Sequence, residues 1–248
     1  FAYISHRFPH DNRVKMLSNE FCSGCTCTDY CSDATNCACQ QLTFAESRSK
    51  TTGYSGKRLV EQVPSGIYEC NQFCRCSKKR CLNRVVQQGI TIPLQVYKTI
   101  GSGWGVRSLV DLPQGSFVCS LNGPVITDEM ADELADDQEY FAQLDHCSLC
   151  DVGKYFEEEG ATKLFVLNVK TIGNIGRLIN HSCDPNLFTQ QVFLETHDPR
   201  LPHVAFFTKK DVKAGEELVF DYGWVVDIAN PRGVICRCGS TNCRRVLL

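Results

Sequence analysis

Cysteine is the feature that most constrains this chain, because seventeen of its 248 residues are cysteines and most of them lie in three short arrays. A secreted disulfide framework is usually short and has an even number of cysteines. This chain is long, has an odd number and repeats the pair Cys-x-Cys. Two thiolates this close in sequence can bind one metal ion or two neighbouring ions. The arrays therefore predict zinc, and with it a reducing, intracellular compartment.

The first two arrays together hold nine cysteines, too many for two four-cysteine sites. They are Cys25, Cys27, Cys31, Cys37 and Cys39, followed by Cys70, Cys74, Cys76 and Cys81. Three zinc ions need four ligands each, and six terminal plus three bridging thiolates supply that number. The alternative is two ordinary zinc sites with one spare cysteine. In either case closed coordination predicts a structural role, in which metal binding is part of the folding free energy.

The third array lies near the end of the chain and supplies three ligands, Cys236, Cys238 and Cys243. A tetrahedral zinc needs a fourth, and Cys183 is the natural donor. This fourth zinc would tie the end of the chain to the segment around Asn180. Cys22, Cys119, Cys147 and Cys150 are left without an assignment.

The segment from Gly173 to Leu187 (GNIGRLINHSCDPNL) combines apolar residues at helical spacing, an Asn-His pair and an Asp-Pro-Asn turn. The apolar part predicts one or two helical turns, and the proline ends them. A loop fixed between an apolar anchor and a rigid turn is a good place for a functional site. The alternative is a buried Asn-His pair that satisfies local backbone groups.

Alternating patterns after residue 90 predict a mainly β fold. We expect strands over 94–99, 116–121, 163–168, 188–194 and 204–208 and one ending within 217–223, a short helix over 128–137, and a polar loop over 40–69. The segment GSGWG at 101–105 suits either a close backbone approach to a ligand or a tight hairpin with an anchoring tryptophan.

Composition excludes some functions. The net charge of −2 argues against a general nucleic-acid binder, and no apolar run approaches the ~20 residues that span a bilayer. Residues 128–159 hold twelve acidic residues and one lysine, which suits either a solvated surface or a field that attracts a basic peptide. The chain begins with Phe1 and not with methionine, so we expect a fragment of a longer protein.

Taken together and in order, these motifs resemble the pre-SET, SET and post-SET arrangement of histone-lysine methyltransferases. The matching pieces are the nine cysteines, GWG at 103–105, RLINHSCDPN at 177–186, GEEL at 215–218, FDYG at 220–223 and the final Cys-x-Cys-x4-Cys. The segments CACQQLT at 37–43, YFAQLD at 140–145, THD at 196–198 and LL at 247–248 look most like the SETDB branch. Two features depart from that branch: the acidic loop 145–163 is short where a long insertion is typical, and Phe220 stands where tryptophan is common.

The resemblance implies a mostly β SET fold of small sheets around a pseudoknot. It implies a pre-SET module with three zincs over residues 1–90, a SET catalytic domain over 91–223 and a zinc-binding post-SET over 224–248. It also implies S-adenosylmethionine as cofactor, held by Ser102, Gly103, Trp104, Gln138, Tyr140, Arg177, Asn180 and His181. In that arrangement Arg177 would face the charged end of the cofactor.

By the same resemblance, Tyr222 orients the substrate amine, with Tyr140, Phe220, Asn180 and His181 around the lysine channel. Phe220 offers no hydroxyl that would restrain the amine, so we expect di- or trimethylation. The implied substrate is the histone H3 tail at lysine nine, and the implied setting is silenced chromatin in the nucleus with chromatin-associated partners. Direct DNA binding by this fragment is not expected. The alternative is a zinc-stabilised scaffold that binds partners without transferring methyl groups; retention of Arg177, Asn180, His181 and Tyr222 favours an enzyme.

Overall fold

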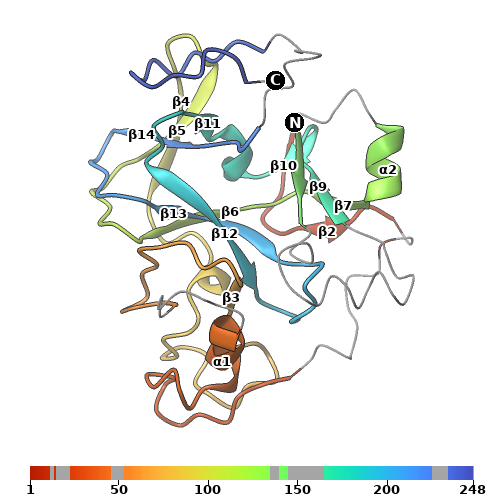
Figure 1. The fold of residues 1–248 in the computed structure, drawn as a ribbon, viewed down its shortest axis with the longest axis vertical. Helices are drawn as coiled ribbons and strands as arrows, with labels where there is room; N and C mark the ends of the chain where they lie inside the picture. Colours follow the sequence, from red (N-terminus) through yellow and green to blue (C-terminus); the bar gives the residue numbers. More distant parts are fainter. Residues whose placement is uncertain are drawn as a thin grey trace.

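The computed structural model describes residues 1–11, 14, 23–45, 53–134, 140–144, 165–224 and 234–247. Three small four-stranded sheets and one two-stranded pair make up the described fold, with two α-helices and short 3-10 turns (Figure 1). The expectation of a mostly β fold is confirmed. No helix in the described residues is both long and apolar enough to cross a bilayer.

The first sheet includes part of the segment from Gly173 to Leu187, which we call the central segment. Its strand order is β11-β14-β5-β4. Its members are β4 (Leu94–Lys98), β5 (Trp104–Ser108), β11 (Asn180–His181) and β14 (Glu217–Phe220). β4 and β5 form a hairpin across the GSGWG turn, as one of the two interpretations predicted, but Trp104 is 55% exposed and does not anchor it. β11 and β14 run parallel, with Asn180 opposite Val219, so the two segments far apart in sequence pass side by side. This crossing is the pseudoknot that the resemblance implied.

The second sheet lies across the middle of the molecule, in the order β3-β12-β13-β6. It contains β3 (Ile67–Tyr68), β6 (Phe117–Leu121), β12 (Leu187–Phe193) and β13 (His203–Thr208). β12 and β13 are antiparallel, with Leu187 opposite Thr208. Through β3 this sheet joins the cysteine-rich part of the chain to the rest.

The third sheet has the order β2-β7-β9-β8. It contains β2 (Phe8–Pro9), β7 (Pro124–Thr127), β8 (Phe141–Gln143) and β9 (Phe165–Asn168). The remaining pair joins β1 (Ala2–Tyr3) to β10 (Ile172–Gly173). The N-terminal residues therefore pack on the SET part of the chain and not on the cysteine arrays.

Helices are few and short. α2 (Asp128–Glu133) starts where the Thr127 hydroxyl accepts a hydrogen bond from the Met130 N–H. Two acidic residues in its first turn interact favourably with the positive end of the helix dipole. The expected helix was longer, and residues 135–137 lie outside the described residues. α1 (Ala38–Ala45) begins in the first cysteine array and extends into the segment 40–69 that was expected as a loop, where Gln40 and Thr43 are buried and hydrogen-bonded. The 3-10 turns are η2 (Val86–Gln88) and η5 (Ile175–Leu178), the latter where helical turns were predicted.

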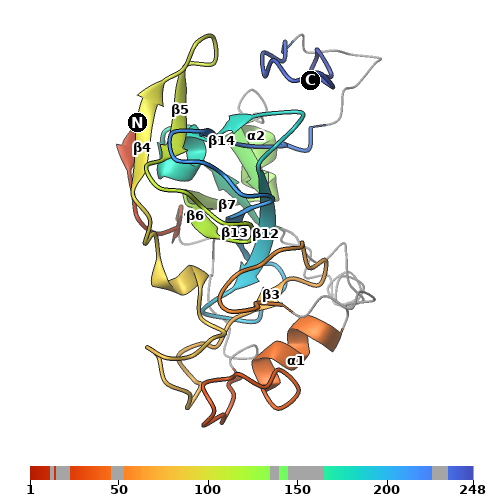
Figure 2. The same cartoon turned by 90° about the vertical axis from the view of Figure 1, so that its left-hand side faces the viewer.

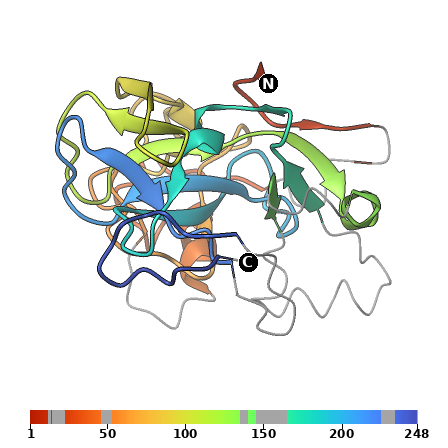
Figure 3. The same ribbon diagram turned by 90° about the horizontal axis from the view of Figure 1, so that it is seen from above.

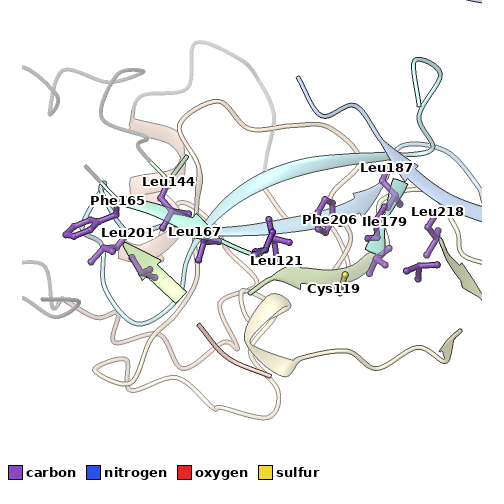
Figure 4. Close-up of a cluster of buried hydrophobic side chains, with 14 of the residues drawn as sticks. Cys119, Leu121, Leu144, Phe165, Leu167, Ile179, Leu187, Leu201, Phe206 and Leu218 are labelled. Carbon is purple, nitrogen blue, oxygen red and sulfur yellow. The ribbon is translucent and has the colours of Figure 1, made fainter. Parts of the chain in front are cut away.

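One apolar core connects the sheets. Its side chains come from β6, β9, β13, β14 and the segment before β11, and Figure 4 shows them as a continuous band from Phe165 and Leu167 through Leu121 and Phe206 to Ile179 and Leu218. Burying each large apolar side chain is worth ~1.5–3 kcal/mol. The cysteine-rich part with α1 lies at one end of the long axis and the C-terminal segment at the other (Figures 1 and 2). Seen along that axis, the N- and C-terminal ends lie on different sides of the sheets (Figure 3).

Candidate active site and zinc centres

The thiols of the first two arrays converge into one cluster. Its sulfurs form foursomes that lie within 4.8 Å of one another: Cys25, Cys39, Cys70 and Cys74; Cys25, Cys27, Cys31 and Cys37; and Cys25, Cys31, Cys70 and Cys76. The thiol of Cys81 lies against those of Cys31, Cys70 and Cys76. None of the fourteen cysteines in the described part of the chain forms a disulfide.

Three thiols occupy the centre of this cluster, because Cys25, Cys31 and Cys70 each belong to more than one foursome. Their sulfurs are 3.6–3.7 Å apart. These are the positions that bridging ligands need, and six other cysteines surround them. Buried thiols are the ligands that zinc prefers. The donor set therefore fits three zinc ions better than two separate sites with a spare cysteine.

Hydrogen bonds from the backbone prepare the cluster for anionic sulfur. The N–H groups of Cys25 and Asn71 donate to the sulfur of Cys74 at 3.3 and 3.2 Å. Arg84 is buried at 3% exposure, and its guanidinium donates to the Asn71 carbonyl at 2.7 Å and to the Cys76 sulfur at 3.8 Å. No carboxylate in the described residues pairs with it, and its Nε is buried without a partner. The thiolates are thus the counter-charge of this arginine.

The end of the chain folds back onto the central segment, as the cysteine count predicted. Cys183, Cys236, Cys238 and Cys243 place their sulfurs within 4.8 Å of one another. The backbone N–H of Arg244 donates to the Cys183 sulfur at 3.3 Å. These four thiols fit one tetrahedral zinc.

Asn180 and His181 are held by contacts with three other segments. The Asn180 amide donates to the Trp104 carbonyl at 3.0 Å and to Glu217 Oε1 at 2.8 Å. His181 Nδ1 accepts the Tyr222 N–H at 3.2 Å, and its Nε2 lies 3.3 Å from the Cys183 sulfur. Burial lowers the pKa of His181, which favours the neutral ring, and its Nδ1 acts as an acceptor for the backbone. As the alternative interpretation predicted, this Asn-His pair satisfies backbone groups, namely the Trp104 carbonyl and the Tyr222 N–H. The same pair also lines a hollow.

Tyr222 occupies an aromatic wall immediately after β14. Its hydroxyl donates to the Ile179 carbonyl at 3.2 Å, and its ring centroid lies 4.8 Å from those of Phe220 and Trp224. Burial is the main cause that raises the pKa of Tyr222 to about 12. The hydroxyl therefore stays protonated at neutral pH. Sequence reasoning did not single out Trp224, although its position two residues after Tyr222 placed it on the same side.

Two hollows lie on either side of the β11–β14 crossing. Tyr140, Arg177, Ile179, Phe220, Tyr222 and Trp224 line one of them. Ser102, Asn180, His181, Glu217, Val219 and Arg237 line the other. Neighbouring residues of a strand point to opposite faces, which explains why Val219 and Phe220 separate. The crossing thus separates an aromatic hollow, whose lining also includes Asp128, Asp132 and Asp221, from a polar one.

Arg177 lies in the aromatic hollow, and its expected place at the charged end of the cofactor stays a prediction. Its guanidinium donates to the carbonyls of Val169 and Lys170 and lies 5.0 and 5.1 Å from the rings of Phe1 and Tyr140. These contacts hold Tyr140 in place. Of the remaining predicted cofactor residues, Ser102, Gly103 and Trp104 are exposed, and Gln138 lies outside the described residues.

Comparisons with known proteins agree with this geometry. The SET domain family matches residues 103–223, and the Pre-SET motif matches residues 1–84. The Drosophila melanogaster histone-lysine N-methyltransferase eggless is 34% identical over 339 aligned residues, which cover 100% of this chain and 27% of eggless. The aligned span exceeds the 248 residues of this chain, so eggless carries additional residues within it. This agrees with a shortened insertion and is compatible with the SETDB branch.

Solved structures give the same class. The Neurospora SET domain protein DIM-5, a histone lysine methyltransferase, is 32% identical to this chain and has a TM-score of 0.76. The match covers 95% of this chain and 93% of the DIM-5 chain. KRYPTONITE in complex with DNA, an H3(1–15) peptide and SAH is 31% identical with a TM-score of 0.78, over 100% of this chain and 48% of that one. The chain belongs to the SET-domain family of histone-lysine methyltransferases, and it has the pre-SET motif of that family. It spans about a quarter of the length of the first curated relatives it matches.

Proposed function

We propose that this chain transfers methyl groups from S-adenosylmethionine to a lysine of the histone H3 tail, lysine nine, in the nucleus. The observation that carries this proposal is the pair of hollows that meet at the β11–β14 crossing, one polar and one aromatic. A methyl donor bound in one hollow and a lysine bound in the other would need to bring the methyl carbon and the amine nitrogen into contact at that crossing. KRYPTONITE's binding of an H3 peptide and SAH supports the same assignment.

The polar hollow suits a zwitterionic sulfonium compound. Lys98 and Arg237 can balance a carboxylate, and Glu216 and Glu217 can face positive charge. Asn180 and His181 lie at its inner wall. The cofactor, when bound, supplies an electrophilic methyl group on its sulfonium. The polar residues of this chain hold it and direct that methyl towards the crossing.

The aromatic hollow prepares the lysine amine. The attacking nitrogen must be neutral, and a free lysine has a pKa near ~10.4. An apolar surround such as Phe220, Tyr222 and Trp224 disfavours the ammonium form, because burial penalises the charge. The proton therefore leaves to solvent before the nitrogen lone pair forms the new bond to the methyl carbon and the carbon–sulfur bond breaks.

Tyr222 orients that amine without acting as a base. Its hydroxyl already donates to the Ile179 carbonyl, so its oxygen is free to accept an amine N–H. With a pKa of about 12 it has almost no tyrosinate at neutral pH. Orientation and desolvation then supply most of the rate acceleration. Phe220 leaves room for an amine that already carries methyl groups, and we infer di- or trimethylation from it.

The test is methyl transfer from labelled S-adenosylmethionine to an H3 tail peptide, beside a peptide in which lysine nine is arginine. We expect transfer only to the unmodified peptide, with about four zincs per chain in the same sample. Transfer to both peptides would contradict the choice of lysine nine. Four zincs with no transfer to either peptide would contradict the enzyme and favour the scaffold.

A further inference from the structure

A loop on the pre-SET module carries four exposed cations within six residues. They are Arg75, Lys78, Lys79 and Arg80, which we call the basic loop. None of them has a carboxylate partner within 4.0 Å among the residues that the structure describes. Residues 70–84 contain no acidic residue at all. The net charge of −2 for the whole chain therefore conceals a local surplus of positive charge.

Tyr30 contacts the basic loop, and the acidic side chains nearest to Tyr30 in sequence are hydrogen-bonded within their own turn. Asp29 accepts hydrogen bonds from the N–H groups of Cys31 and Asp33, and the Asp33 carboxylate accepts from Thr35 and Asn36. These bonds hold both carboxylates in their own turn. In contrast, Arg80 donates to the Tyr30 hydroxyl at 3.0 Å and lies over its ring at 5.7 Å. Tyr30 thus fixes the direction of one cation in the loop.

The zinc cluster provides a competing explanation, because nine thiolates around three divalent ions are anionic. The contacts assign that role to Arg84, which is buried and is the one cation within residues 70–84 whose guanidinium contacts a cysteine sulfur. The cations of the basic loop are exposed, Arg80 with its contact to Tyr30 included, so solvent screens them from the cluster. They remain available to a partner.

We propose that the basic loop binds the phosphate backbone of duplex DNA. Unpaired lysine and arginine side chains are the groups that make such contacts. The inference rests on the proposed function, because a histone tail leaves a particle wrapped in DNA. The loop belongs to the end of the molecule opposite the C-terminal segment, so DNA bound there leaves the active site free for the tail (Figures 1 and 2). This proposal departs from the expectation, based on the net charge of −2, that this fragment does not bind DNA directly.

Binding of a fluorescent DNA duplex across a salt series tests the proposal. Each phosphate contact contributes about 0.9 to the slope of log affinity against log salt, so Lys78→Gln/Lys79→Gln should reduce the slope by about 2. At physiological salt this corresponds to an affinity loss of roughly 10- to 30-fold. The control, Lys209→Gln/Lys213→Gln, removes two exposed lysines from the SET part, of which Lys213 pairs with Asp111 at 3.0 Å, and should leave the slope unchanged. Zinc content of both variants reports on folding.

Equal losses in the two variants, or no loss in either, would overturn the proposal. Tighter binding of single-stranded RNA or an acidic peptide than of duplex DNA would overturn it as well. Methylation measured on an H3 peptide and on nucleosomes separates this inference from the proposed function. We expect Lys78→Gln/Lys79→Gln to reduce methylation of nucleosomes about 10-fold and to leave that of the peptide unchanged. A wild-type chain that binds DNA through the loop but methylates neither substrate would refute only the proposed function.

Discussion

At the scale of single residues, Tyr222 is the group on which the proposed chemistry depends most. Tyr222→Phe removes the oxygen that orients the amine and keeps the ring that packs on Phe220 and Trp224. We expect kcat to fall by about 10² or more, with little change in cofactor affinity. Steady-state kinetics with the H3 peptide measure both. Tyr3→Phe, an exposed tyrosine of β1, is the control and should behave as wild type.

The same residue sets the expected pH dependence. The substrate lysine must lose a proton, so kcat/KM should rise with pH from 7 towards the lysine pKa near ~10.4. Tyr222 has its pKa raised to about 12 by burial, so its hydroxyl form persists through this range and is lost only above it. A rate profile at constant ionic strength checks this. A descending limb centred near pH 9 would show that Tyr222 does not have the protonation state assigned to it.

Phe220 allows a test of product number. Its ring lies 4.8 Å from those of Phe206 and Tyr222, so a hydroxyl added by Phe220→Tyr would enter the aromatic hollow. We expect mass spectra to shift from di- or trimethyl product towards monomethyl product. A wild-type chain that makes only monomethyl product, and dimethyl product only after this residue is changed, would refute the inference.

At the scale of elements, alternation predicted the central strands, and the cysteine count predicted which thiols converge into two clusters that could hold zinc. β12 and β13 follow their predicted ranges closely, and both strands contribute side chains to two apolar clusters, Leu187 and Phe206 to one and Val192 and Phe207 to the other. α1 could not be found this way, since Gln40 and Thr43 are polar and their burial depends on partners in Cys31 and Tyr68. The ring contacts of Arg177 could not be predicted from the sequence for a similar reason. Its contacts with Phe1 and Tyr140 arise only when three segments meet.

The pre-SET element yields a prediction about Arg84. Arg84→Gln leaves a buried anionic cluster without its contacting cation, and such a loss costs ~1–3 kcal/mol. We expect zinc to leave this variant faster under a chelator, as followed with a zinc-sensitive dye. Arg75→Gln, which removes an exposed arginine of the same segment, should release zinc at the wild-type rate. Equal release from both variants would show that Arg84 does not stabilise the cluster.

At the scale of the whole molecule, the site is assembled from segments that lie far apart in sequence. Residues near 102, 140, 177–181, 217–224 and 236–244 meet around one strand crossing. The order of motifs predicted which segments take part. It could not predict which hollow each side chain would enter, because that depends on the register of β11 against β14.

The two zinc centres differ in exposure, and this predicts an order of metal loss. Eight of the nine pre-SET cysteines are buried, whereas of the four post-SET cysteines only Cys236 is. A chelator should therefore remove about one zinc quickly and the other three slowly. We expect activity to disappear with the first zinc, because Cys183 contacts His181, while circular dichroism stays native until the later phase. Cys243→Ser should reproduce the first stage, and Cys70→Ser, which lacks a shared thiol, should not fold.

Release of all four zincs in one phase would show that the two centres are coupled and not independent. Activity that survives loss of the first zinc would show that the post-SET centre is not needed to hold the Asn180–His181 wall.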